Sequence, residues 1–236
     1  MSKQTFWALL PAAGVGKRMQ ADCPKQYLPL LNKTVLEQSL DCFLSHPKIK
    51  GVVLVLGHED GYWPDSPLAS HPKIRRAKGG QERFHSVLNG LSVLAEQADE
   101  NDWVLVHDAA RPCLRRADLD RLLAVLAEDE VGGLLALPVR DTMKRATSDG
   151  EVSETVDREA LWHALTPQMF RLGALQAAIE QCIEEGLAIT DDASAMERVG
   201  FRPKLIEGCE DNIKITRPRD LRLAEIYLLE QRGELG

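Results

Sequence analysis

The chain has 236 residues, 44% of them hydrophobic and 28% charged, a balance typical of a globular protein with a large core. A formal net charge of -7 argues against a general affinity for nucleic acid, whose phosphates favour a basic surface. No apolar run reaches the ~18 residues of a membrane helix, and the run 6–10 is too short for a signal-peptide core, so we expect a cytoplasmic protein without a membrane partner.

Short apolar runs alternate with helical patterns along the chain. This alternation is typical of βαβ units and predicts an α/β fold, with a Rossmann-like, mostly parallel sheet flanked by helices in one domain over 1–236. Strands are predicted over 6–10, 52–56, 103–106, 132–139, 204–206 and 212–215, and helices over 34–45, 84–94, 119–126, 175–183, from about 190 and after 218. Three prolines between 64 and 72 predict turns there.

The stretch from about 140 to 167 differs from the rest, because it is charged and poor in apolar residues. Its Ser148-Asp149-Gly150 turn signal lies between two short candidate strands and predicts a protruding hairpin arm. A plain surface excursion is the alternative, but it would leave Leu161, Trp162 and Leu165 uncovered. A partner subunit could bury them.

The five cysteines are odd in number and widely scattered. None forms a C-x-x-C pair, so neither a disulfide framework nor a zinc site is indicated, and we expect reduced thiols. They are Cys23, Cys42, Cys113, Cys182 and Cys209.

A loop of small residues, 11–16, follows the first predicted strand. Small side chains let backbone N–H groups approach and hold phosphates, although a simple tight turn explains the loop equally well. Met19 stands where a dinucleotide-binding loop has its third glycine, and no G-K-[ST] follows as in a Walker A loop. With Gly14, Gly16, Arg18 and then Pro24-Lys25, the spacing resembles the signature of sugar-phosphate nucleotidylyltransferases.

Further blocks, at 79–86, 107–112, 156–158 with 165–168, and 211–214, narrow this resemblance. Together they resemble the 2-C-methyl-D-erythritol 4-phosphate cytidylyltransferase family over most of the chain, from Pro11 to about Tyr227. The resemblance implies cytidylyl transfer from CTP to a sugar-alcohol phosphate, with release of pyrophosphate. The catalytic positions of the family fall on Arg18, Lys25, Arg158 and Lys214.

The resemblance also implies binding positions for both substrates. Cytosine and ribose would be held by Ala12, Ala13, Gly14, Gly16, Gly80, Gln81, Ser86 and Asp108. The acceptor would be held by Arg111, Thr142, Arg158, Thr166, Thr190, Asp211 and Lys214. The family often has Asp where this chain has Gln81, a change that a backbone contact would survive.

Mg²⁺ is the cofactor that the resemblance implies. It would bridge the triphosphate, with phosphate and water as most of its ligands and Asp108 as a candidate protein ligand. In the family the arm crosses to the neighbouring subunit, which implies a homodimer in which Arg158 completes the partner's site.

Several of these residues have simpler interpretations. Asp108 could cap the next helix, Thr190 could be an N-cap, and Arg158 could pair with Glu154 or Glu159 on the surface. A lone histidine at a strand end, such as His107, is more often part of the scaffold than a base.

The sequence fits two other classes of protein less well. A nicotinamide dehydrogenase needs an acidic residue closing its second strand about 20 residues after the glycines, whereas here that strand ends later, in Gly57-His58. A nucleotide-sensing module without turnover would have no need of Arg18, Lys25 and Lys214. Ribitol 5-phosphate stays open as an acceptor, because related enzymes share the loop and the lysine.

Overall fold

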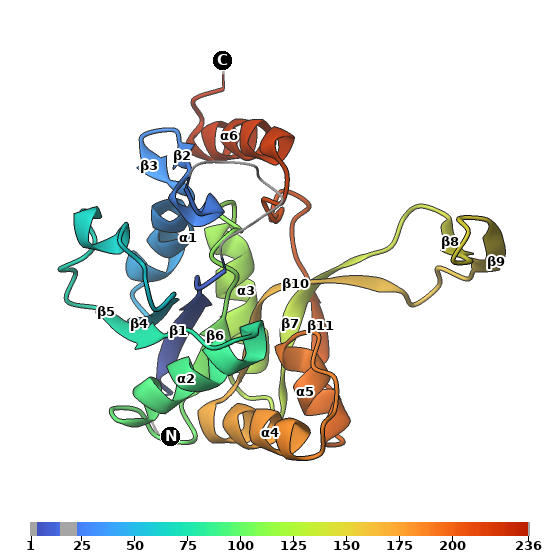
Figure 1. The fold of residues 1–236 in the computed structure, drawn as a ribbon, viewed down its shortest axis with the longest axis horizontal. Coiled ribbons are helices and arrows are strands. Elements are labelled where there is room, and N and C mark those ends of the chain that lie inside the picture. Colours follow the sequence, from blue (N-terminus) through green and yellow to red (C-terminus); the bar gives the residue numbers. More distant parts are fainter. Residues whose placement is uncertain (1–3, 15–22, 236) are drawn as a thin grey trace.

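The computed structural model describes residues 4–14 and 23–235. Within them, seven strands form a central sheet in the order β11-β7-β10-β6-β1-β4-β5 (Figure 1). The strands are β1 (Phe6–Pro11), β4 (Ile49–Leu56), β5 (Ile74–Lys78), β6 (Trp103–Val106), β7 (Gly132–Pro138), β10 (Trp162–Arg171) and β11 (Lys204–Glu207). Neighbours are parallel except where β10 pairs antiparallel with β6 and β7, which confirms the predicted mostly parallel sheet.

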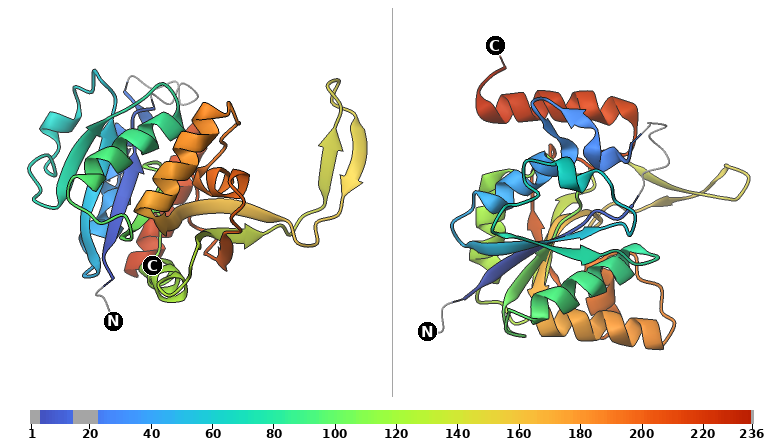
Figure 2. Two further views of the ribbon diagram at one scale, coloured as in Figure 1. Left: turned by 90° about the horizontal axis from the view of Figure 1, so that it is seen from below. Right: turned by 60° about the vertical axis from the view of Figure 1, so that its left-hand side comes forward.

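The helices cover both faces of this sheet (Figure 2). They are α1 (Val35–Leu44), α2 (Arg83–Ala95), α3 (Arg116–Leu126), α4 (Leu172–Glu184), α5 (Asp192–Arg198) and α6 (Pro218–Arg232). Because side chains alternate along a strand, Ala8 and Leu10 of β1 pack with α1 and α3, whereas Trp7 and Leu9 pack with α2, α4 and α5. The last helix, α6, packs on a third cluster with Leu30 of the short strand β2 (Pro29–Leu30).

The start of α1 follows the prediction from its capping sequence. The Glu37 N–H donates to Thr34 Oγ1 at 3.2 Å, and the Thr34 N–H donates to the Glu37 carboxylate at 2.8 Å. These reciprocal bonds satisfy two donors that a helix N-terminus leaves unpaired. Thr34 ends β3 (Lys33–Thr34), which pairs with β2 beside the short 3-10 helix η2 (Lys25–Tyr27).

The structure contains two strands that the sequence did not predict, β5 and β10, and lacks one that it did predict. The turn-rich stretch before 79 contains the 3-10 helix η3 (Trp63–Asp65) but also β5, an edge strand whose Arg75 and Arg76 are exposed and therefore hid its pattern. Residues 212–215 form no strand, because their backbone groups are used in the loop. The Asn212 N–H donates to Cys209 O, and the Ile215 N–H donates to Ala110 O.

The predicted arm is present but shorter than expected. Its strands β8 (Met143–Ala146) and β9 (Val152–Val156) pair antiparallel and project well away from the sheet (Figures 1 and 2). From Trp162 onward the chain already belongs to β10, so the arm ends before 162 and not at 167. Leu165 is buried in the chain's own core and needs no partner to cover it, whereas Leu161 is exposed.

None of the helices in the described part of the chain is both long enough and apolar enough to cross a membrane.

Candidate active site

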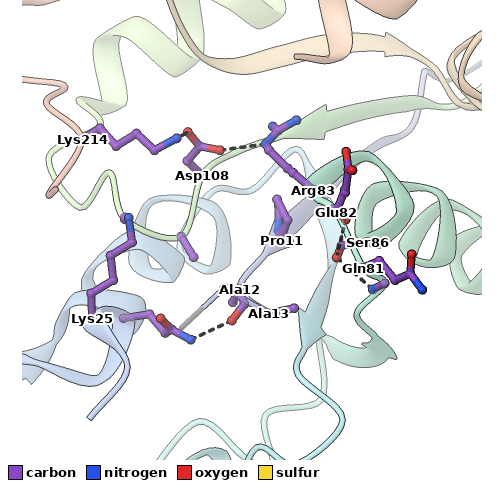
Figure 3. Close-up of a pocket in the computed structure, with 15 residues that line it drawn as sticks. Pro11, Ala12, Ala13, Lys25, Gln81, Glu82, Arg83, Ser86, Asp108 and Lys214 are labelled. Atoms are coloured by element: carbon purple, nitrogen blue, oxygen red, sulfur yellow. Dashed lines mark hydrogen bonds and ion pairs between the residues drawn. The ribbon is translucent and has the colours of Figure 1, made fainter. Parts of the chain in front are cut away.

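A pocket of about 240 Å³ lies where three parallel strands end at their carboxyl side (Figure 3). The loops that follow β1, β5 and β6 supply most of its wall. In open α/β sheets, ligands bind outside this carboxyl edge. The lining residues are Pro11, Ala12, Ala13, Gly14, Lys25, Gln26, Gly80, Gln81, Glu82, Arg83, Ser86, Asp108, Ala109, Ala110 and Lys214.

The two loops after β1 and β5 approach each other closely at a glycine. A Cβ on Gly79 would lie only 2.3 Å from the Cβ of Ala13, so no other residue fits there without moving a wall. Next to it, Ser86 Oγ accepts a hydrogen bond from the Gly80 N–H at 3.0 Å. On the opposite side, Gln26 Nε2 donates to the Ala12 carbonyl at 2.7 Å and fixes the β1 loop. The pocket is narrow because the residues of its walls are small and hydrogen bonds hold both loops in place.

Asp108 is the central charge of the pocket and is surrounded by cations (Figure 3). Lys214 Nζ lies 2.7 Å from Oδ2, Arg83 Nε lies 3.2 Å from Oδ1, and Arg111 Nε lies 3.6 Å from Oδ2. Burial alone would raise the pKa of this carboxyl, but the charges of Arg83, Lys214 and Arg111 lower it below its ordinary range. Asp108 therefore stays ionised, and it does not merely cap a helix.

His107, which precedes it, belongs to the scaffold as predicted. Its ring is buried, with Nε2 3.0 Å from the Arg111 carbonyl and Nδ1 3.0 Å from Thr166 Oγ1. Burial lowers its pKa to about 4, so the imidazole is neutral near pH 7. Thr166 Oγ1 also accepts from the Asp108 N–H at 3.1 Å, which ties the loop after β6 to β10.

Lys25 reaches the pocket from η2, which begins after Pro24. Its ammonium donates to the carbonyl of Ile215 at 3.1 Å, so the segments that carry Lys25 and Lys214 are in direct contact. The motifs that carry these two lysines are far apart in sequence. The structure brings both lysines to one pocket, as the motifs predicted.

Arg111 and Asp211 hold the loop that carries Lys214. Arg111 is buried and donates to the Asn212 carbonyl at 2.7 Å. Asp211 is buried beyond the pocket lining, where its carboxylate accepts from Arg115 at 2.5 Å and from Gln231 of α6 at 2.8 Å. Both predicted acceptor residues thus make their contacts within the chain.

Of the seven predicted acceptor residues, only Lys214 lines this pocket. Arg111, Thr166 and Asp211 are buried outside its lining, and the other three are exposed. Thr142 and Arg158 lie exposed on the arm, and Thr190 is exposed before α5. Arg158 donates to the Arg140 carbonyl, while Glu154 pairs with Arg145, so the suggested surface pair with Glu154 does not form.

Two further outcomes concern residues near these sites. The N-cap of α5 is Asp191, so the alternative that Thr190 serves as that N-cap is wrong. Gly16 and Arg18 lie outside the described residues.

Arg83 and Gln26 are pocket residues to which the sequence assigned no part. Arg83 bridges Asp108 to the buried Asp192, with NH1 and NH2 at 3.1 and 2.8 Å from the two Asp192 oxygens. Both residues stand inside blocks that carry the family resemblance. The signal that could have found them was a charged or amide side chain within two positions of a predicted site residue, Gln81 for Arg83 and Lys25 for Gln26.

The described residues hold no cluster of three or more His, Cys, Asp and Glu side chains arranged to bind a metal. Two carboxylate residues line the pocket, Glu82 and the ionised Asp108. This donor set fits an ion such as Mg²⁺ only if phosphate and water supply most of its ligands, as Mg²⁺ in nucleotide sites prefers.

The chain matches the family model of 2-C-methyl-D-erythritol 4-phosphate cytidylyltransferase over residues 6–230. It is 61% identical over 217 residues to the protein of that name from Pseudomonas putida (strain W619), with 92% of each chain covered. The counterpart from Pseudomonas aeruginosa strain PAO1 is 60% identical over 217 residues, covering 92% of this chain and 93% of its own.

Solved structures agree with these matches. A crystal structure of 4-diphosphocytidyl-2C-methyl-D-erythritol synthase is 42% identical with a TM-score of 0.83, covering 96% of this chain and 100% of that one. The 2-C-methyl-D-erythritol 4-phosphate cytidylyltransferase of Francisella tularensis is 36% identical with a TM-score of 0.84, covering 95% and 100%. These matches define the chain as a nucleotidyltransferase. The chain belongs to the 2-C-methyl-D-erythritol 4-phosphate cytidylyltransferase family, which confirms the resemblance read from its motifs.

Proposed function

We propose that this enzyme binds CTP in the pocket of Figure 3 and transfers its cytidylyl group to 2-C-methyl-D-erythritol 4-phosphate, a step of non-mevalonate isoprenoid synthesis. The observation that carries the proposal is the meeting of Lys25 and Lys214 around a glycine-lined pocket at the carboxyl edge of the sheet. The whole chain would act as one nucleotidylyltransferase domain with the arm inserted.

The base and ribose would lie between the two small-residue loops. The close approach of Gly79 to Ala13 keeps the pocket narrow, which favours a single-ring base over a purine. Backbone groups of 12–14 and of Gly80 would read the base edge, and Ser86 fixes the orientation of the Gly80 peptide. Gln81 is exposed, so we assign it a contact through its backbone.

The reaction needs no protein nucleophile and no general base. An oxygen of the acceptor phosphate attacks the α-phosphorus of CTP, a new P–O bond forms, and the bond to the bridging oxygen of the β-phosphate breaks, so its electron pair leaves with pyrophosphate. The second pKa of a phosphate monoester is about 6, so the attacking oxygen is already ionised at neutral pH. The neutral His107 and the buried Cys113, whose pKa burial raises to about 12, suit this assignment.

The cations would supply the catalysis by electrostatic stabilisation, as phosphoryl-type transfer requires. We assign Lys25 and Arg18 to the charge that develops around the α-phosphate, and Lys214 to the attacking phosphate. In the described structure Lys214 is held by Asp108, so it must exchange this carboxylate for a phosphate when the acceptor arrives. Mg²⁺ bound to the triphosphate would supply a Lewis acid for pyrophosphate departure, and we assign Asp108 as the residue that would hold it.

The acceptor site would be completed by a second subunit. Thr142 and Arg158 lie exposed on the projecting arm, outside the lining of their own chain's pocket, and Met143 and Val152 expose apolar surface beside them. An arm of this kind supports a homodimer in which each arm reaches the partner's site. Arg111, Thr166, Thr190 and Asp211 would shape the acceptor side from within the chain.

The experiment is an assay of pyrophosphate release. Purified protein, Mg²⁺ and CTP are incubated with 2-C-methyl-D-erythritol 4-phosphate or with ribitol 5-phosphate, and UTP and ATP replace CTP in parallel reactions. We expect the highest kcat/KM with CTP and methylerythritol phosphate. A higher value with ribitol 5-phosphate would overturn the acceptor, and release with ATP as efficient as with CTP would overturn the base pocket.

We place the enzyme in the cytoplasm. All five cysteines are free thiols in the structure, which supports a reducing compartment. Fractionation of the native cells and detection of the protein with an antibody tests this placement.

A further inference from the structure

A buried carboxylate outside the pocket holds one of the pocket's cations in place. Asp192, the first residue of α5, has a side chain only 1% exposed, and it does not line the pocket. Both of its oxygens bind Arg83, at 3.1 and 2.8 Å, while the third nitrogen of that guanidinium binds Asp108 at 3.2 Å. The planar fork of arginine therefore joins two carboxylates that lie on different elements.

Hydrogen bonds from β10 fix the position of the N-terminus of α5, where Asp192 lies. Gln168 of β10 accepts a hydrogen bond from the Ala193 N–H at 2.7 Å and donates to Asp191 at 2.8 Å. Gln168 is itself 1% exposed. The N-terminus of α5 is thus attached to the same strand that binds the Asp108 backbone through Thr166. A closed path of side chains runs from β10 through α5, α2 and the loop after β6 back to β10.

The two cations Arg83 and Lys214 differ in how firmly they are held beside Asp108. Arg83, Asp108 and Asp191 are the charged groups that face Asp192, and Arg83 is the one that compensates its buried charge. Lys214, by contrast, is 39% exposed and contacts Asp108 through one ammonium. An ammonium on a long, half-exposed stem is easily moved, whereas a bidentate guanidinium against a buried carboxylate is not. Arg83 is the fixed counter-ion of Asp108, and Lys214 is the exchangeable one.

We infer that Asp192 is a positioning residue for the transfer reaction: by clamping Arg83 it keeps the Asp108 carboxylate neutralised and oriented when Lys214 leaves for the reacting phosphate. The inference rests on the proposed function, in which Lys214 contacts a phosphate. Without the ion pair to Asp192, Arg83 would move with Asp108 or toward the substrate phosphates. The Asp108 carboxylate would then lack a fixed counter-ion and would retain Lys214. The chemical step would suffer more than the binding of CTP.

The first variant is Asp192→Asn, which keeps the shape and removes the charge. We expect kcat to fall by about 10- to 100-fold, the scale on which outer partners and small displacements act, with the KM for CTP changed by less than about threefold. A folded variant, judged by circular dichroism and thermal unfolding, with kcat within about twofold of the wild type would overturn the inference. Wild-type protein without any pyrophosphate release counts against the proposed function instead.

Glu37→Gln is the matched control. Glu37 is also a buried carboxylate, bound by the Thr34 N–H and by Ser66 Oγ, and it lies outside the pocket lining. We expect this variant to lose stability and keep the wild-type kcat. An equal loss of kcat in both variants would mean that Asp192 acts only through general stability, which would overturn the positioning role.

The second variant is Arg83→Lys, which tests the inference even if Asp192→Asn fails to fold. Lysine keeps the charge beside Asp108, but one ammonium cannot reproduce the fork that spans both carboxylates. We expect kcat to fall by about tenfold or more, and Arg83→Lys with wild-type kcat would overturn the inference. If Asp192 acts through Arg83, the variant that combines Asp192→Asn with Arg83→Lys should have a kcat no more than about threefold below that of the more impaired single variant. Fully additive losses of kcat, on a free-energy scale, would contradict that route.

Discussion

The ammonium of Lys214 and the carboxylate of Asp108, which come from the loops before α6 and after β6, meet at 2.7 Å beside the pocket. Their contact means that the cation proposed for the acceptor phosphate rests on a carboxylate that Arg83 and Arg111 also neutralise. The pair is thus a resting arrangement that a phosphate can replace. Its strength is set by how well Arg83 and Arg111 share the charge of Asp108.

Lys214→Ala should lower kcat by about 10²- to 10³-fold, the scale of losing one preorganised charge from the transition state. The fold should survive, because the side chain is 39% exposed. Lys33→Ala is the matched control, since Lys33 is 37% exposed, also pairs with an aspartate, and lies outside the pocket lining. Steady-state release of pyrophosphate measures both. Equal kcat values for the two variants would contradict the role of Lys214.

Lys25→Ala should also lower kcat by about 10²- to 10³-fold, while CTP still binds. The reason is that its ammonium is proposed to act on the charge that appears in the transition state and not on the cytosine. Calorimetric titration with CTP and steady-state kinetics separate the two effects. A loss of kcat below about threefold would favour a nucleotide-sensing protein over an enzyme.

Gly79→Ala should weaken CTP binding. The added Cβ would lie 2.3 Å from the Ala13 Cβ and 3.2 Å from the Leu56 carbonyl, so the two walls must separate. Overpacking of this kind costs about 1–3 kcal/mol, which predicts a decrease in kcat/KM for CTP of roughly 5- to 150-fold. Gly61→Ala is the control, because a Cβ there meets nothing within 4 Å. Unchanged kcat/KM in Gly79→Ala would show that the walls are not in contact with the base.

His107 should make the fold less stable in mild acid. Burial lowers its pKa from an ordinary value of 6.5 to about 4 in the folded protein, so the unfolded chain takes up this proton first as the pH falls. Its contribution is therefore constant above pH 6.5 and is lost between 6.5 and 4, with a slope of up to about 1.4 kcal/mol per pH unit.

Thermal and denaturant unfolding of His107→Gln between pH 4 and 6.5 tests this slope. The variant should be less stable at pH 7, where it has lost the bonds to Thr166 and Arg111, yet its stability should fall less steeply with acid. The same slope in both proteins would show that the pKa of His107 is not lowered in the fold.

Mixing two inactive variants tests the shared site. If the arm of one subunit serves the partner, an Arg158→Ala chain and a Lys25→Ala chain form mixed dimers with one intact site, and random pairing restores roughly one quarter of wild-type turnover. Deletion within 141–155 should weaken the dimer in sedimentation experiments and lower activity with it. Absence of recovery in mixtures shown to contain mixed dimers would place Arg158 in its own subunit's site or in none.

The sequence was sufficient for the α/β order and for most elements, because buried parallel strands are continuous apolar runs and Thr34 and Glu37 mark a helix start directly. The strand β10 was hidden because its central residues Thr166 and Gln168 are polar. Both are buried and hydrogen-bonded to distant segments, and no local pattern indicates such partners.

The candidate site was predictable where motifs are contiguous and less so where charges meet across the fold. The glycine loops and Lys25 indicated a phosphate site through their own chemistry, whereas the place of Lys214 followed only from family resemblance. Arg83 was overlooked because its partner Asp192 stands more than a hundred positions away. Sequence spacing predicts contacts within an element, but tertiary packing alone sets which distant ions pair.

The arm leaves the sheet at the end of β7 and returns as β10, and these two strands are neighbours, with Trp162 opposite Pro138 at the point of departure. The base of the arm is therefore held by the hydrogen bonds between β7 and β10, and these do not depend on the length of the arm. Natural variants and engineers can lengthen, shorten or resurface the outer hairpin without shifting the register of any core strand. The surface of the arm and the stability of the core are in this way separable properties of one continuous chain.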